Sequence, residues 1–97
     1  MQVNSSPELD SETAFIEVNE MPVGMQADAV RFTVDAMNKN HDKGIVAAYV
    51  KRVFDKTYEP SWHCVVGRNF GSCVGHEGRS FTYFYLRENG VLLFKCG

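Results

Sequence analysis

The chain has few cysteines, and their arrangement excludes a disulfide framework and the common zinc motifs. Only three of its 97 residues are cysteines, Cys64, Cys73 and Cys96. An odd number at wide spacing does not suggest a set of disulfides, and no CxxC pair is present. Free thiols are typical of a reducing compartment. We therefore expect neither disulfides nor a bound metal or other cofactor.

Positive charge is missing from the first part of the chain. Residues 1–30 contain six acidic residues and no lysine or arginine, whereas residues 31–97 contain ten basic and six acidic residues. This basic excess is too small and too dispersed for a nucleic-acid surface. Residues 1–13 are polar and acidic, and we expect them to form a disordered tail before one domain at 14–97.

Long hydrophobic runs are also missing. No apolar stretch approaches the length needed to cross a membrane, and residues 1–20 lack the basic start and apolar core of a signal peptide. We therefore expect a cytoplasmic protein with no membrane partner. Hydrophobic residues still make up 44% of the chain and aromatic residues 12%, which is typical of a globular domain.

The spacing of apolar residues predicts a strand and then two helices. Residues 14–19 alternate between apolar and polar, as a half-buried strand does. Steps of three and four predict helices at 25–38 and 43–57, and Asp42 is a suitable N-cap for the second. The apolar stripe of the second helix consists of Val46, Val50, Val53 and Phe54, widened by Ile45 and Tyr49.

From Ser61 the pattern changes to a period of two, which indicates strands. Four strands are predicted, with Asn89-Gly90 as the turn of a tight hairpin, at 62–66, 69–75, 80–86 and 91–95. The order of elements predicts an α+β domain, in which an antiparallel sheet carries both helices on one side.

The stretch WHCVVGRNFGSCV, from Trp62 to Val74, indicates how the protein acts. Its pattern predicts two strands joined at Gly67-Arg68. The second strand contains Gly71 and Ser72, whose small side chains leave its backbone accessible. An accessible strand edge can accept a strand from another chain. This favours a protein that binds extended peptides.

Several segments together resemble the small cytoplasmic dynein light chains of the light-chain-eight type. They are FDKTYEPSWH at 54–63, SWHCVVGRNFGS at 61–72, the pair His76-Glu77, FTYFYL at 81–86 and VLLFK followed by Gly97. The match runs from about Ala14 to Gly97, and residues 1–13 lie outside it.

The resemblance implies a non-enzymatic homodimer in which the segment at 69–75 crosses to the partner's sheet. Each of two grooves then holds a short extended segment of a client, such as the dynein intermediate chain or another protein with a disordered motif. The implied function is a dimerisation hub of the microtubule-associated dynein complex in the cytoplasm. An alternative is a dedicated structural subunit of an axonemal or cytoplasmic dynein, with a single partner.

By resemblance, two sets of residues form the site. The peptide-binding set is Lys43, Gly44, Asn69, Phe70, Gly71, Ser72, Cys73, Val74, Gly75, His76, Phe81, Tyr83 and Tyr85. The dimer-interface set is Trp62, His63, Val65, Gly67, Arg68, Asn69, Phe70, Gly71, Ser72, Cys73 and Val74. Trp62 has a second interpretation, as a core residue.

The chain departs from the family at several of these positions. Cys73 stands where a Tyr is usual, Gly75 where a Thr is usual, and Gly44 where a Lys is usual at the helix start. In addition, Ser80 replaces a His and Cys96 replaces a Ser. These changes shrink the groove and remove polar partners, so we expect a client preference that differs from the family's usual Gln-Thr motif.

Three other interpretations concern His63. By resemblance it faces its symmetry mate in the dimer, and because an unperturbed histidine titrates near 6.5, mild acid is expected to split the dimer. A catalytic pair with Cys64 is disfavoured, because adjacent strand residues face opposite sides. A zinc site with Cys64, Cys73 and His76 has no usual ligand spacing.

Overall fold

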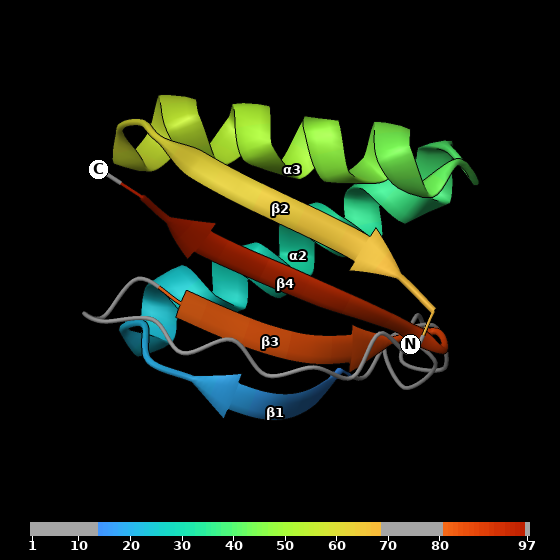
Figure 1. Ribbon diagram of the computed structural model, residues 1–97, viewed down its shortest axis with the longest axis horizontal. Helices are drawn as coiled ribbons and strands as arrows, with labels where there is room; N and C mark the ends of the chain where they lie inside the picture. Colours follow the sequence, from blue (N-terminus) through green and yellow to red (C-terminus); the bar gives the residue numbers. More distant parts are fainter. Residues whose placement is uncertain (1–13, 69–80, 97) are drawn as a thin grey trace, which may run out of the picture.

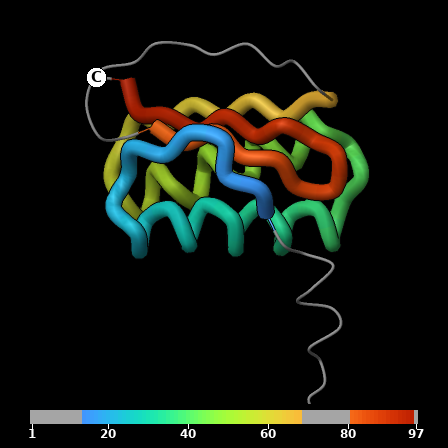
Figure 2. Tube along the Cα trace, turned by 90° about the horizontal axis from the view of Figure 1, so that it is seen from below, coloured from blue at the N-terminus to red at the C-terminus, as the bar shows by residue number. Residues whose placement is uncertain are grey.

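The computed structural model describes residues 14–68 and 81–96, which form one antiparallel sheet with two helices against it. The elements are β1 (Phe15–Asn19), α2 (Val23–Lys39), α3 (Lys43–Tyr58), β2 (Trp62–Gly67), β3 (Phe81–Leu86) and β4 (Asn89–Lys95). The strand order is β1-β3-β4-β2. Both helices lie on one face of this sheet (Figures 1 and 2). The predicted α+β class and layer arrangement are confirmed.

The two helices begin in different ways. The side chain of Asp42 accepts a hydrogen bond of 3.1 Å from the backbone N–H of Ile45, so the predicted cap of α3 is confirmed. Helix α2 begins at Val23, two residues before the predicted start. Pro22 precedes it and supplies only its carbonyl, which accepts from the backbone N–H of Gln26 at 2.9 Å. Because this start has no side-chain cap, the sequence did not mark it.

The core lies between the sheet and the helices and is centred on Phe54, which is fully buried. Its ring lies 4.8 Å from that of Trp62 and 5.0 Å from that of Tyr58, measured between centroids. The Phe32 ring of α2 lies 5.9 Å away on the other side. These rings join both helices to the start of β2, so the position of β2 depends on aromatic packing.

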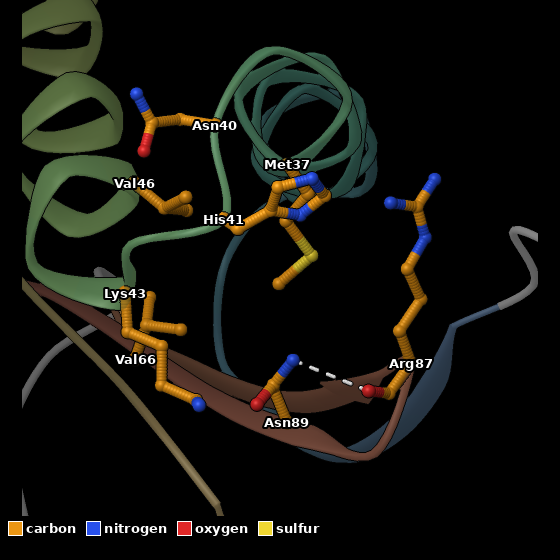
Figure 3. Close-up of a pocket in the computed structure, with 8 residues that line it drawn as sticks. All are labelled: Met37, Asn40, His41, Lys43, Val46, Val66, Arg87 and Asn89. Carbon is orange, nitrogen blue, oxygen red and sulfur yellow. Dashed lines mark hydrogen bonds between the residues drawn. The ribbon is translucent and has the colours of Figure 1, made fainter.

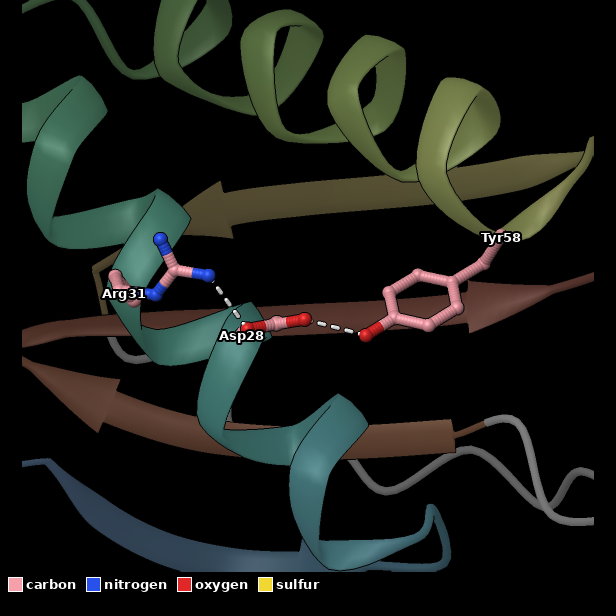
Figure 4. Close-up of polar contacts among 3 residues, drawn as sticks. All are labelled: Asp28, Arg31 and Tyr58. Atoms are coloured by element: carbon pink, nitrogen blue, oxygen red, sulfur yellow. Dashed lines mark hydrogen bonds and ion pairs between the residues drawn. The ribbon is translucent and has the colours of Figure 1, made fainter.

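A polar contact reinforces the joint between the helices. Tyr58, at the end of α3, donates a hydrogen bond to the carboxylate of Asp28 in α2, and Arg31 donates to the same carboxylate at 2.7 Å (Figure 4). Both bonds favour the charged carboxylate and hold the pKa of Asp28 below its usual value. The same contact raises the pKa of Tyr58, since its proton binds the carboxylate.

The turn between β3 and β4 differs from the predicted one. Asn89 and Gly90 are the first residues of β4, and the turn consists of Arg87 and Glu88, with φ of 53° and 67°. The register pairs Leu86 with Asn89. A turn at Asn89-Gly90 would shift the pairing by four residues and set Leu86 opposite Leu93, without changing which side chains face the helices. It would also remove Gly90 from β4, where Gly90 pairs with Gly67 of β2. The observed turn keeps this pairing, although Asn-Gly is the better turn sequence.

Ile45 does not extend the core as predicted, because its side chain is 52% exposed. Val46, Val50 and Phe54 of the same helix are buried and form the stripe that packs on the sheet. The predicted strand at 69–75, Ser80 and the tail at 1–13 lie outside the described residues.

Candidate functional site

Strand β2 is an end strand of the sheet and is held firmly in place. It pairs with β4 on one side, and no other described strand pairs with its second edge. Asp55 of α3 accepts a hydrogen bond of 2.8 Å from the backbone N–H of Trp62, the first residue of β2. Lys51 donates to the other carboxylate oxygen of Asp55 at 2.5 Å. Among the described residues, β2 is thus anchored at its start and has one edge without a strand partner.

The face of the sheet away from the helices is aromatic and apolar. Phe81, Tyr83 and Leu92 form a cluster there, with Val18, Tyr85 and Phe94 packed against it. The hydroxyl of Tyr83 donates to that of Tyr85 at 3.1 Å. No described helix covers this face, since both helices lie against the other one (Figure 2). Phe81, Tyr83 and Leu92 are nevertheless buried, at 4%, 3% and 6% exposed, and Tyr85 and Phe94 are half-buried.

His63 and Val65 extend this outer face across β2 to the open edge. His63 pairs with Phe94 in the register, and their rings stack at 5.3 Å. Val65 pairs with Leu92 and is 46% exposed. Each therefore has one side against the cluster and one side open, as expected for residues at an interface between two chains.

The predicted peptide-binding residues fall on two sides of the molecule. Lys43 and Gly44 begin α3 and are exposed. Phe81, Tyr83 and Tyr85 belong to β3 and lie in the cluster on the outer face of the sheet. Because the helices occupy the opposite face, one chain does not bring the two groups together. The other predicted residues, at 69–76, lie outside the described part of the chain.

Trp62 is a core residue, although the resemblance favoured the dimer interface over the core for it. Its side chain is 1% exposed and packs between Phe54 and Tyr58 on the helix side of the sheet. The indole therefore offers no surface on the face that carries His63 and Val65. The other predicted interface residues within the described part, Gly67 and Arg68, stand at the end of β2 and after it.

Leu92, Phe94 and Val18 belong to the outer face but were not predicted for it. The sequence partly indicated Leu92 and Phe94, because successive residues of the strand segment VLLFK point to alternate faces of the sheet. Val91 and Leu93 face the helices, and Leu92 and Phe94 face outward. The sequence shows this alternation but not which set lies under the helices.

The side chains of His63 and Cys64 point to opposite faces, as predicted, and form no catalytic pair. Cys64 packs against the core, where burial raises the pKa of its thiol to about 12. Such a thiol is protonated at neutral pH and is a poor nucleophile. Within residues 14–68 and 81–96, no group of three His, Cys, Asp or Glu side chains could hold a metal ion.

Asp55 should make the stability of the fold depend on pH in the acid range. Its bonds to Lys51 and to the Trp62 backbone lower the pKa of its carboxyl from the ordinary 3.8. A lowered folded-state pKa stabilises the protein fully above the unfolded value, and this contribution is lost as pH falls through the folded-state pKa. We expect Asp55→Asn to be less stable than the native chain at pH 6, with a smaller difference at pH 2.5.

Urea unfolding of both proteins at the two pH values measures this difference. Asp35→Asn, which changes an exposed carboxylate of α2, is the matched control. If Asp55→Asn lowered the stability equally at both pH values, the negative charge of Asp55 would not be the source of its contribution.

Comparison with known proteins agrees with this geometry. The family model described as dynein light chain type 1 matches residues 13–96. The chain belongs to the dynein light chain family. The match covers both helices and all four described strands, so it includes β2 and the outer face of the sheet.

Solved structures of dynein light chain-like domains share the fold. The domain of the Fasciola hepatica calcium binding protein FhCaBP2, in its native crystal form, matches with a TM-score of 0.72 at 19% identity over 100% of both chains. Its mercury derivative matches with a TM-score of 0.69 at 21% identity, over 87% of this chain and 92% of that one. The domain of CsTAL3 matches with a TM-score of 0.72 at 16% identity, over 84% and 90%.

Membership of this family implies protein partners and an association with cytoplasmic dynein. Dynein light chains as a family are not enzymes. In the described ranges, neither helix is long and apolar enough to span a membrane.

Proposed function

We propose that this dynein light chain is a homodimer that binds short extended segments of client proteins by strand addition and holds two client chains together. The observation that supports this most directly is that β2 has one edge without a described strand partner and lies beside an apolar cluster on the sheet face opposite the helices. Strand addition to such an edge supplies backbone hydrogen bonds, and pockets for alternate side chains supply specificity.

The separation of the predicted groove residues supports a dimer. Lys43 and Gly44 stand at the start of α3, and the aromatic residues of β3 lie on the outer face of the sheet. A groove that uses both groups therefore needs one group from each of two chains. We propose that the segment at 69–75 crosses to the partner's β2 and carries the client strand with it.

Two grooves on one dimer explain how weak contacts can give firm binding. A short peptide buries little area, so a single groove is expected to bind weakly. A client that is itself dimeric occupies both grooves, and its avidity can rise by roughly 10²–10⁴ through effective concentration. We propose the dynein intermediate chain and other proteins with disordered motifs as such clients.

Peptide titration tests the groove and its specificity. We expect a labelled peptide with a Gln-Thr motif to bind Cys73→Tyr/Gly75→Thr about two- to tenfold more tightly than the native chain, because one restored hydrogen bond contributes about 0.5–1.5 kcal/mol. Fluorescence anisotropy gives both dissociation constants. Cys96→Ser also restores the family residue, but in the exposed segment after β4, and should leave the affinity unchanged. Equal binding by all three proteins would argue against the groove at 69–75.

The alternative is a dedicated structural subunit with one partner, and the replaced residues Cys73, Gly75 and Gly44 favour it. A peptide array distinguishes the two functions. Binding of many unrelated sequences supports a hub, whereas binding of a single sequence supports a dedicated subunit.

Mild acid should dissociate the dimer through His63. The imidazole stacks on Phe94 and stands at the edge of the outer face that has no described strand partner. Histidine is the side-chain type that ordinarily changes charge between pH 7 and pH 5. In a dimer it would be buried near its symmetry mate, and charging two buried imidazoles opposes association. We expect sedimentation to show a dimer at pH 7 and an increasing share of monomer towards pH 5.

Matched histidine variants identify the residue responsible. His63→Gln should keep its mass constant over this range, and His41→Gln, which changes an exposed residue before α3, should behave like the native chain. A native dimer whose mass is the same at pH 5 and pH 7 would exclude this role of His63.

A further inference from the structure

A pocket of about 110 Å³ lies at the end of the molecule where the two helices meet the β3–β4 turn. Its apolar side is formed by Met37, Val46 and Val66, one residue each from α2, α3 and β2. Lys43 and Arg87 stand on opposite sides of its opening, with Asn89 between them (Figure 3). This pocket lies on the helix side of the sheet, away from the outer face described above.

The polar groups that line this pocket suit an anion. Lys43 and Arg87 carry positive charge at neutral pH, and Asn40, His41 and Asn89 complete the polar part of the lining. Among the described residues no carboxylate belongs to the lining, and Arg87 also donates a hydrogen bond of 2.7 Å to the side chain of Asn38. The nearest acids along the chain are Asp42, whose side chain caps α3, and Glu88, which is exposed in the turn.

The first part of the same chain enters the described structure at this end. Phe15 pairs with Tyr85, so Ala14, the first described residue, comes next to Leu86 and the turn that contains Arg87. Figure 1 shows the start of β1 and the β3–β4 turn at the same end of the sheet. Residues before Ala14 are therefore tethered beside the pocket.

The sequence before Ala14 is complementary in charge to the pocket. Glu8, Asp10 and Glu12 are its only charged side chains and occupy every second position. In an extended segment such residues point to one side. At about 3.5 Å per residue they lie within roughly 21, 14 and 7 Å of Ala14 along the chain.

We propose that the acidic segment at 8–12 docks on the pocket between the α2–α3 loop and the β3–β4 turn of its own chain. The carboxylates bind the charged groups of Lys43 and Arg87, and Leu9 lies over the apolar side. Each exposed ion pair is weak, but the tether supplies a high effective concentration. This inference does not depend on client binding.

Zero-length cross-linking of the full-length chain tests the proposal. A water-soluble carbodiimide joins a carboxylate to a lysine amine only where the two groups are in contact, and mass spectrometry identifies the joined peptides. We expect the segment at 8–12 to join Lys43 in preference to Lys56, an exposed lysine near the other end of α3. Joining to both lysines in equal yield would overturn the proposal.

Charge variants separate docking from random collision. Arg87→Gln should lower the Lys43 yield about two- to fivefold, the factor that corresponds to the loss of one exposed ion pair, and 0.5 M NaCl should lower it further. Arg52→Gln removes an exposed charge from the outer side of α3 and should leave the yield unchanged. Equal effects of both substitutions would contradict a specific pocket.

Mixing isotopically labelled and unlabelled chains identifies the occupant. In an equal mixture, a link within one chain contains a single isotope, whereas half of the links between two chains contain both. We expect almost all of the product to contain a single isotope. A mixed product that makes up about half of the total would assign the pocket to the acidic segment of a second copy and overturn docking on the same chain.

Discussion

Replacing Phe54 by alanine should lower the free energy of unfolding by about 3–5 kcal/mol. Phe54 is fully buried and its ring lies within 6 Å of the rings of Phe32, Tyr58 and Trp62. The substitution removes the ring at the centre of this cluster, which leaves a cavity that the surrounding side chains fill only in part. A domain of this size has a total stability of about 5–15 kcal/mol, so the effect is a large share of it.

Urea unfolding at one fixed protein concentration measures the loss, because dimerisation makes apparent stability depend on concentration. Phe15→Ala removes the same side chain from a position in β1 that is 64% exposed, and should change stability by less than about 1 kcal/mol. If both variants lost the same amount, the central position of Phe54 in the core would be wrong. A Phe54→Leu variant, which keeps most of the volume, should recover a large part of the loss.

A charge at Val65 should dissociate the proposed dimer. Val65 stands at the open edge of the outer face, is 46% exposed in one chain, and pairs with Leu92 of the apolar cluster. In Val65→Asp the dimer would bury an unpaired carboxylate in each of two copies, and one such group typically costs about 3–5 kcal/mol. We expect the dissociation constant of the dimer to rise at least about 100-fold.

Sedimentation at several protein concentrations measures this constant. Val23→Asp places the same charge at the start of α2, where the side chain is 84% exposed, and should leave the native dimer intact. Circular dichroism of both variants confirms that the fold is retained. A folded Val65→Asp protein that remains as dimeric as the native chain would show that the outer face of β2 is not the dimer interface.

Some of the structural features behind these predictions could be predicted from the sequence, and others could not. The apolar stripe of α3 and its cap at Asp42 were predicted, because both depend on local spacing. The start of α2 at Val23 and the turn at Arg87-Glu88 were not predicted. At the first, Pro22 gives no side-chain signal, and at the second, strand register imposed left-handed backbone on two residues that do not favour it.

The candidate site was also predictable only in part. Resemblance identified the family, and the family match confirms it. The assignment of β2 and the aromatic run of β3 to a binding site stays a prediction. Resemblance did not show that Lys43 and the β3 aromatic residues lie on opposite sides of one chain. That separation depends on which face of the sheet the helices cover.

By itself, the sequence determined the α+β class, the two helices, the alternation of the strands and the family, because these follow from local periodicity and from a long distinctive segment. The tertiary structure decided that Trp62 is core, that His63, Val65 and Leu92 form one outer face, and that Lys43 and Arg87 line opposite sides of one pocket. Each of these depends on how residues distant in the chain are placed relative to one another. These placements are set by the strand order and by the face on which the helices pack, and no local pattern specifies either.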